Sequence, residues 1–185
     1  RLLMNLFFKA TNYSTDKRVR DKMLSQIAFE LGVISNVQAD HSGAITRLKH
    51  AIDYALNNAD NESWLHAHIE HFYATCLQIP LKEILLKAQD LLETAKIHQD
   101  HVAEMRIYMV LAHTYNFYGD HAKGFTYGQQ SLVLANAVKK PYSIVLALSQ
   151  LAPLVFKNPH LESYGRHIIT VWQQAIRSNK SLRLY

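Results

Sequence analysis

Apolar and polar residues alternate along this chain with the 3.6-residue period of amphipathic helices. The periodic segments are roughly 16 to 18 residues long, and short polar breaks separate them. They occur in pairs, so that a first and a second helix form each hairpin. The pattern predicts first helices at about 22–38, 63–78, 102–118 and 142–157, and second helices at about 41–58, 81–98, 121–138 and 160–177.

An alanine recurs every 40 residues in the second helix of each pair, at Ala55, Ala95, Ala135 and Ala175. Ala10 fits as a fifth member with a longer spacer. Self-similarity at a fixed period is the signature of a repeat architecture, in which each unit is one supersecondary motif. We therefore expect a single repeat domain over 1–185, with a leading helix at about 1–12 and repeats at about 22–60, 62–100, 102–140 and 142–179.

The breaks between the predicted helices carry the chemistry of helix ends. Gly119 can adopt the left-handed conformation that ends a helix, and Asp120 can cap the next helix by accepting from its free amides. Ala39 and Asp40 repeat this arrangement less strongly.

Prolines mark further helix starts. Pro80, Pro141 and Pro159 each fall near a predicted first turn, where the missing N–H has no hydrogen bond to lose. Pro153 is the exception, because it lies inside the helix predicted at 142–157 and should kink it.

Composition narrows the class of protein. The 185 residues are 49% hydrophobic, which is ample for a core, and only 6 Gly and 4 Pro favour helices over an all-β fold. One cysteine excludes an internal disulfide framework, and no apolar run is long enough to span a membrane. A net charge of +5 is too mild to indicate nucleic-acid binding. Because Arg1 stands in place of Met and an apolar helical pattern follows at once, we expect a fragment of a longer protein.

The third unit has Tyr108, Leu111-Ala112, Tyr115 and Gly119-Asp120. With these residues it closely resembles a tetratricopeptide repeat. Its large apolar, Leu-small, Tyr and Gly-Asp positions stand at the spacing of that family, and the first unit matches in Leu31-Gly32, Asp40, Ala44, Leu48 and Ala51. The second unit departs, with His71-Phe72 in place of Leu-small and Ile79-Pro80 at the turn; the fourth keeps Leu151-Ala152 but has Asn158-Pro159-His160. The residues of the third unit that carry the resemblance are Tyr108-Met109-Val110-Leu111-Ala112-His113-Thr114-Tyr115, Gly119-Asp120, Leu132 and Ala135.

The 40-residue period is longer than the common 34-residue repeat and is similar to the type in MalT-like bacterial regulators and related signalling proteins. The resemblance implies an all-α, right-handed superhelical α-solenoid of four hairpins plus one N-terminal helix. It also implies that a protein or peptide partner binds in the concave groove of a cytoplasmic, bacterial signalling or transcription-regulatory protein. No contact of this fragment with nucleic acid or membrane is expected. The alternative is a structural scaffold or self-association module, with a homodimer formed through the terminal helices.

In this family the first helix of each repeat lines the groove. When the groove positions of the family's first helix are transferred to this sequence, they select a stripe of apolar, aromatic and hydrogen-bonding side chains. The resemblance implies that this stripe suits peptide recognition better than catalysis. Val33, Ile69, Cys76, Leu146, Ser149 and Phe156 also fall on the stripe. The ligand-binding residues expected from the resemblance are Gln26, Phe29, Asn36, His66, Tyr73, Arg106, Met109, His113, Asn116, Phe117 and Lys157.

Two features of this stripe indicate how a ligand is held. Asn36 and Asn116 occupy the same repeat position, where a carboxamide can donate to and accept from an extended peptide backbone. Asparagine near a helix C-terminus also satisfies local backbone groups, and this alternative stays open. Arg106, with His66 and His113 on adjoining helices, can receive an acidic side chain or a terminal carboxylate; a solvated helix face is the simpler interpretation.

Eleven histidines invite a metal hypothesis, above all in the run His66-Ala67-His68-Ile69-Glu70-His71. Its spacing is poor, because His66 and His68 point to different sides of a helix and only His68 and His71 lie close. Packing in the core explains His68 and His71 better than metal binding does. Cys76 is alone and has no local signature of a nucleophile. We therefore expect no catalytic residues, no metal and no cofactor.

Overall fold

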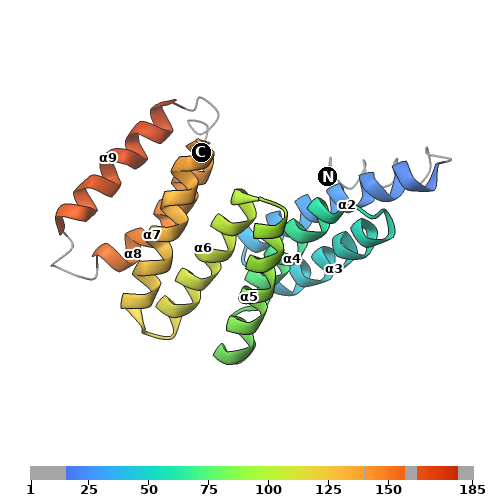
Figure 1. Cartoon of the computed structure of the whole chain (residues 1–185), viewed down its shortest axis with the longest axis horizontal. Coiled ribbons are helices and arrows are strands. Elements are labelled where there is room, and N and C mark those ends of the chain that lie inside the picture. Colours follow the sequence, from blue (N-terminus) through green and yellow to red (C-terminus); the bar gives the residue numbers. More distant parts are fainter. Residues whose placement is uncertain (1–15, 140, 157–161, 179–185) are drawn as a thin grey trace. The chain divides into compact units, whose positions relative to one another are not determined.

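The computed structural model describes residues 16–139, 141–156 and 162–178, and every regular element in these ranges is an α-helix (Figure 1). All eight helices predicted between 22 and 177 are present, and the largest shift of a boundary is at the first of them, which begins at Lys17. The leading helix predicted at 1–12 and Pro159 lie outside the described residues. The helices are α2 (Lys17–Val37), α3 (His41–Asn57), α4 (Asn61–Thr75), α5 (Leu81–Ile97), α6 (His101–Phe117), α7 (His121–Val138), α8 (Pro141–Phe156) and α9 (Glu162–Ser178).

The chain divides into two compact units, Arg1–Ile79 and Pro80–Tyr185. In the first unit α2, α3 and α4 pack in sequence, and α2 also contacts α4. Alanines make this close packing possible, since Ala28, Ala51 and Ala67 form one buried cluster between the three helices. The hydroxyl of Ser25 adds a buried hydrogen bond by donating to the Ala51 carbonyl over 2.9 Å.

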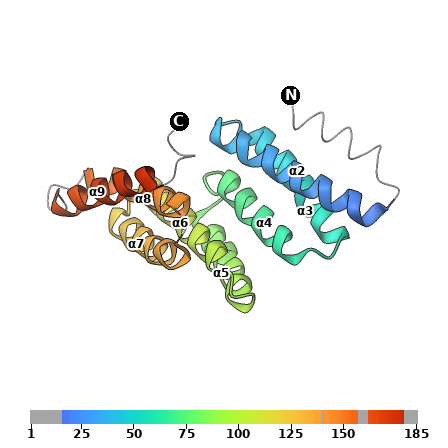
Figure 2. The same cartoon turned by 90° about the horizontal axis from the view of Figure 1, so that it is seen from above.

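In the second unit α5 to α9 also pack in sequence, and α6 contacts α8 (Figure 2). One apolar cluster of this unit joins Leu148, Leu151 and Val155 of α8 to Ile168 of α9. Phe125 and Leu132 of α7, with Ile144 and Val171, pack against this cluster. Helix α8 begins at Pro141, so this proline lies in the first turn as the sequence predicts, and the helix continues past Pro153 to Phe156.

Most turns between helices share one backbone conformation, at positions that differ by multiples of 20 residues. The residue before the helix-capping aspartate has a positive φ at Ala39, Ala59, Gln99 and Gly119, and Lys139 at the end of α7 also has a positive φ. In three of these turns the next amide reaches back to a carbonyl five residues earlier: Asp40 to Ser35, Asp60 to Ala55 and Asp100 to Ala95, over 2.9–3.0 Å. This is the Schellman pattern, which satisfies carbonyls at the helix C-terminus.

The following helix starts with an aspartate cap at four of these turns. The carboxylates of Asp40, Asp60, Asp100 and Asp120 each accept from the backbone amide three residues on, over 2.9–3.1 Å. The caps predicted at Asp40 and Asp120, and the left-handed Gly119, are confirmed.

The turn before α5 is built differently. Pro80 occupies its capping position and offers no side-chain hydrogen bond. It also has no N–H, so it cannot make the five-residue back bond of the other turns. The boundary between the two compact units falls at this turn.

Three of the four recurring alanines are fully buried. Ala55, Ala95 and Ala135 are each 0% exposed, so burial recurs at this repeat position. Nothing is described of the side chain of Ala175.

Candidate functional site

The candidate surface is the stripe of first-helix residues that the sequence predicts to line a groove, and it is carried by α2 and α4 in the first unit and by α6 and α8 in the second. Each unit is treated by itself. In the first unit Gln26 is exposed, His66 and Tyr73 are half-buried, and Asn36 is buried.

Asn36 connects the two first helices of the first unit. Its Nδ2 donates to the backbone carbonyl of Glu70 over 3.3 Å and to Glu70 Oε2 over 3.4 Å. Asn36 is 8% exposed and Glu70 is 6% exposed. The Oδ1 of Asn36 is buried, and no donor in the described part of the chain lies within hydrogen-bond distance of it. The sequence predicted that Asn36 binds a ligand. In the structure its Nδ2 donates to Glu70 of α4, and its Oδ1 has no hydrogen-bond donor among the described residues.

Tyr73 lies one turn beyond Glu70 on α4. Burial raises the pKa of its hydroxyl, and the nearby Cys76 and Glu70 raise it further. The phenol therefore remains protonated and able to donate a hydrogen bond through the neutral range. The thiol of Cys76 donates to the Tyr73 carbonyl over 3.2 Å.

Three residues of the predicted stripe in the first unit face the core. Ile69 is 1% exposed and Cys76 is 0% exposed, so neither lines a surface. Phe29 is half-buried and packs against both alanine-containing clusters of this unit. Helix packing accounts for all three, because α2 and α4 lie against each other as well as against α3.

In the second unit the predicted stripe on α6 is half-buried for most of its length. Arg106, His113 and Asn116 are all of intermediate exposure. The Oδ1 of Asn116 is buried and finds no donor among the described residues, as at Asn36. The two asparagines are 80 residues apart, so this feature recurs at the same repeat position.

Two further residues on α6 have contrasting roles. Met109 packs against a cluster of Met105, Ala135 and Ala147, so much of its side chain serves the core. Phe117 is 61% exposed, and its ring lies edge-on to Tyr118 at 5.6 Å between centroids. Lys157 lies outside the described residues, as do the side chains of Leu146 and Phe156, while Ser149 is exposed.

Two histidines of the run on α4 contact other side chains or are partly buried. The ring of His68 lies tilted against the ring of Trp64 with centroids 4.3 Å apart, and His71 is half-buried. Within 16–139, 141–156 and 162–178, no three His, Cys, Asp or Glu side chains are grouped so as to hold a metal ion. In the same ranges no helix is long and apolar enough to cross a membrane.

Glu70 is the residue of this surface that the sequence analysis missed. Its repeat equivalents are Glu30, which is exposed, and Val110, which is 3% exposed. The residue type at this position therefore carried no signal for the contact, because the same glutamate is exposed in the first repeat.

The described side chains of this surface carry carboxamide, phenol, guanidinium and imidazole groups among apolar side chains. A scan against protein-family models and a search of curated proteins both gave no match to this chain.

Proposed function

We propose that this chain is a non-catalytic, tetratricopeptide-like module that binds a protein or peptide through its first helices. In this proposal the four hairpins form a right-handed α-solenoid within a bacterial signalling or transcription-regulatory protein. The 40-residue period of helices and buried alanines supports the repeat assignment. So do the contacts between first helices, α2 with α4 and α6 with α8, since each repeat in such an array packs on its neighbour.

One observation carries the binding role. Asn36 and Asn116 have the same place in their repeats, and each has a buried Oδ1 with no donor among the described residues. A buried acceptor without a partner costs about 1–3 kcal/mol. A ligand amide that reaches either oxygen removes that cost, and a backbone N–H is a donor that every peptide offers.

Peptides selected from a random display library on the whole chain test this role. Asn116→Ala should weaken the best peptide by at least about fivefold, the equivalent of one lost hydrogen bond. N-methylation of one ligand amide should weaken wild-type binding similarly and should have no added effect on the variant. Asn136→Ala is the matched control, because Asn136 is exposed on the second helix α7.

Asn36→Ala is a second arm and is interpreted together with its stability, because it also removes the contact with Glu70. Equal affinity of wild type, Asn36→Ala and Asn116→Ala for every selected peptide would overturn the assignment. So would methyl or amide NMR shifts confined to α3, α5, α7 and α9.

A further inference from the structure

The N-terminal half of α2 exposes apolar side chains on a face that is buried in later first helices. Val19 is 49% exposed and Met23 is 43% exposed. The counterparts of Met23 in α6 and α8 are Ala103, which is 0% exposed, and Ser143, which is 4% exposed. In the described part of the chain α2 packs on α3 and α4, and these two helices leave Val19 and Met23 open.

In other repeats the preceding second helix covers this face. The buried clusters join Ala67 of α4 to α3 and join Ala147 of α8 to α7. Both alanines correspond to Ile27, which lies one turn after Met23 on the same face of α2. Helix α2 therefore has a place for a second helix that precedes it in the chain.

The chain has a suitable sequence directly before α2. Residues 1–15 lie outside the described residues, and their sequence carries apolar side chains at helical spacing. When Ala10 is aligned on Ala55, three of these side chains take the positions of α3 residues that belong to, or pack against, the clusters shared with α4. The corresponding pairs are Leu3 with Leu48, Leu6 with Ala51 and Phe7 with Ile52.

The length of α2 explains why this segment stands at a longer spacing than the other repeats. Helix α4 begins at Asn61, which corresponds to Asp21, whereas α2 begins one turn earlier at Lys17. This extra turn takes up most of the difference between the Ala10–Ala55 interval and the 40-residue period. The connection into α2 is therefore close in length to the connection between α3 and α4.

We propose that residues 2–10 of this chain pack on the N-terminal half of α2 as a further second helix and cover this end of the repeat array. Nine residues of helix span about 13 Å, which reaches along α2 from Val19 to about Ile27. Ile34 and Val37, which are 40% and 82% exposed, lie beyond that reach. An array of repeats needs a covered end for solubility, and this segment provides it.

The short connection selects the chain's own segment over a second copy. Residues 11–16 tie the segment to α2, so that its binding to this face is an intramolecular step. A short tether gives an effective concentration in the millimolar range, which a separate molecule must exceed to compete.

Oxidation of methionines by hydrogen peroxide, followed by peptide mass spectrometry on the whole chain, tests the contact. Met23 should oxidise about fivefold more slowly in the wild type than in the double variant Leu6→Asp/Phe7→Asp, because exposure controls the reaction. Met105, which is 1% exposed, is the internal reference for an intact fold and should stay protected in both proteins.

A second double variant is the matched control. Asn5→Asp/Lys9→Gln changes the net charge by the same amount as Leu6→Asp/Phe7→Asp, but at the polar positions of the segment. Met23 should remain protected in this control, because the apolar side chains that cover it are unchanged.

A substitution on α2 tests the same contact from the other side. Met23→Asp should speed trypsin cleavage after Lys9 about tenfold, because the segment must leave α2 before it is cut. Val37→Asp is the control, since Val37 is also an exposed apolar residue of α2 but lies beyond the reach of the segment. This arm also decides the matter if Met105 loses protection in Leu6→Asp/Phe7→Asp, because Met23→Asp alters an exposed side chain.

Three results would overturn this inference. They are equal oxidation of Met23 in the wild type and in Leu6→Asp/Phe7→Asp with Met105 protected, equal trypsin cleavage of Met23→Asp and Val37→Asp, and protection of Met23 that increases with protein concentration. The last result would assign the face to a second copy. Asn116→Ala should leave the protection of Met23 unchanged, so this inference and the proposed peptide binding fail separately.

Discussion

The Nδ2 of Asn36 lies 3.3 Å from the backbone carbonyl oxygen of Glu70, and this hydrogen bond joins α2 directly to α4. Both residues are more than nine-tenths buried. One asparagine therefore stabilises the packing of two first helices and also keeps an unsatisfied acceptor. The dual role makes its substitution informative for both stability and binding.

Asn36→Ala should lower the free energy of unfolding of the first unit by about 1–3 kcal/mol, because Glu70 loses a donor in a buried setting. Urea denaturation followed by Trp64 fluorescence, in a Trp172→Phe background, measures this. Gln26→Ala is the control and should change stability by less than about 0.5 kcal/mol, since Gln26 is exposed. Equal effects of the two substitutions would contradict a structural role for Asn36.

The left-handed turn positions predict opposite effects for a matched pair of substitutions. Ala59 has φ 54° and Gly119 has φ 84°. Ala59→Gly should stabilise the first unit, and Gly119→Ala should destabilise the second, each by about 1 kcal/mol, because a Cβ is strained in this region. An added Cβ at Gly119 would meet nothing within 4 Å, so the effect there is conformational and not steric. Thermal unfolding followed by circular dichroism checks both signs.

A second glycine acts through close packing. A Cβ at Gly128 would lie 2.5 Å from Leu151 Cδ2, and Leu151 is 0% exposed. Gly128→Ala should therefore destabilise the second unit by about 1–3 kcal/mol. Combining it with Leu151→Ala should cost less than the sum of the single changes, because the truncated leucine makes room for the methyl. Additive losses in this double-mutant cycle would exclude direct contact.

The cap of α7 predicts a pH dependence. Hydrogen bonds from the Lys123 side chain and backbone amide lower the pKa of Asp120 below its ordinary value of 3.8. A lowered pKa in the folded state means that the carboxylate contributes stability above pH 3.8, and that this contribution is lost as the pH falls through the lowered value. The stability difference between wild type and Asp120→Asn should therefore shrink on acidification. A difference that stays constant from neutral to acidic pH would show that the charge does not contribute.

The positions of the helices were accessible from sequence because they depend on local chemistry. Apolar periodicity, the aspartates at Asp40 and Asp120, and Gly119 act within a few residues of themselves, and α3, α6 and α7 begin and end close to where these residues place them. The recurring alanines were equally visible, since burial at a fixed repeat position leaves a periodic trace.

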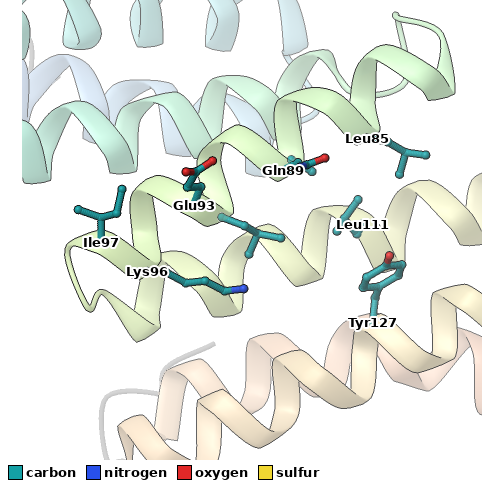
Figure 3. A pocket seen from close by; sticks show the side chains of 9 residues that line it. Leu85, Gln89, Glu93, Lys96, Ile97, Leu111 and Tyr127 are labelled. Carbon is teal, nitrogen blue, oxygen red and sulfur yellow. The ribbon is translucent and has the colours of Figure 1, made fainter.

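Tertiary structure alone decided what the polar side chains of the surface do. The same asparagine pattern predicts a ligand contact and a helix-end contact, and only the approach of α4 reveals that Asn36 donates to Glu70. A cavity lined by Leu85 and other residues of α5, together with Leu111 and Tyr127, could not be predicted from the sequence (Figure 3). It depends on how α5 lies against two other helices. Sequence determined where each helix lies along the chain, since those forces act between near neighbours. Which side chains meet between helices was decided by packing, which brings together residues far apart in the sequence.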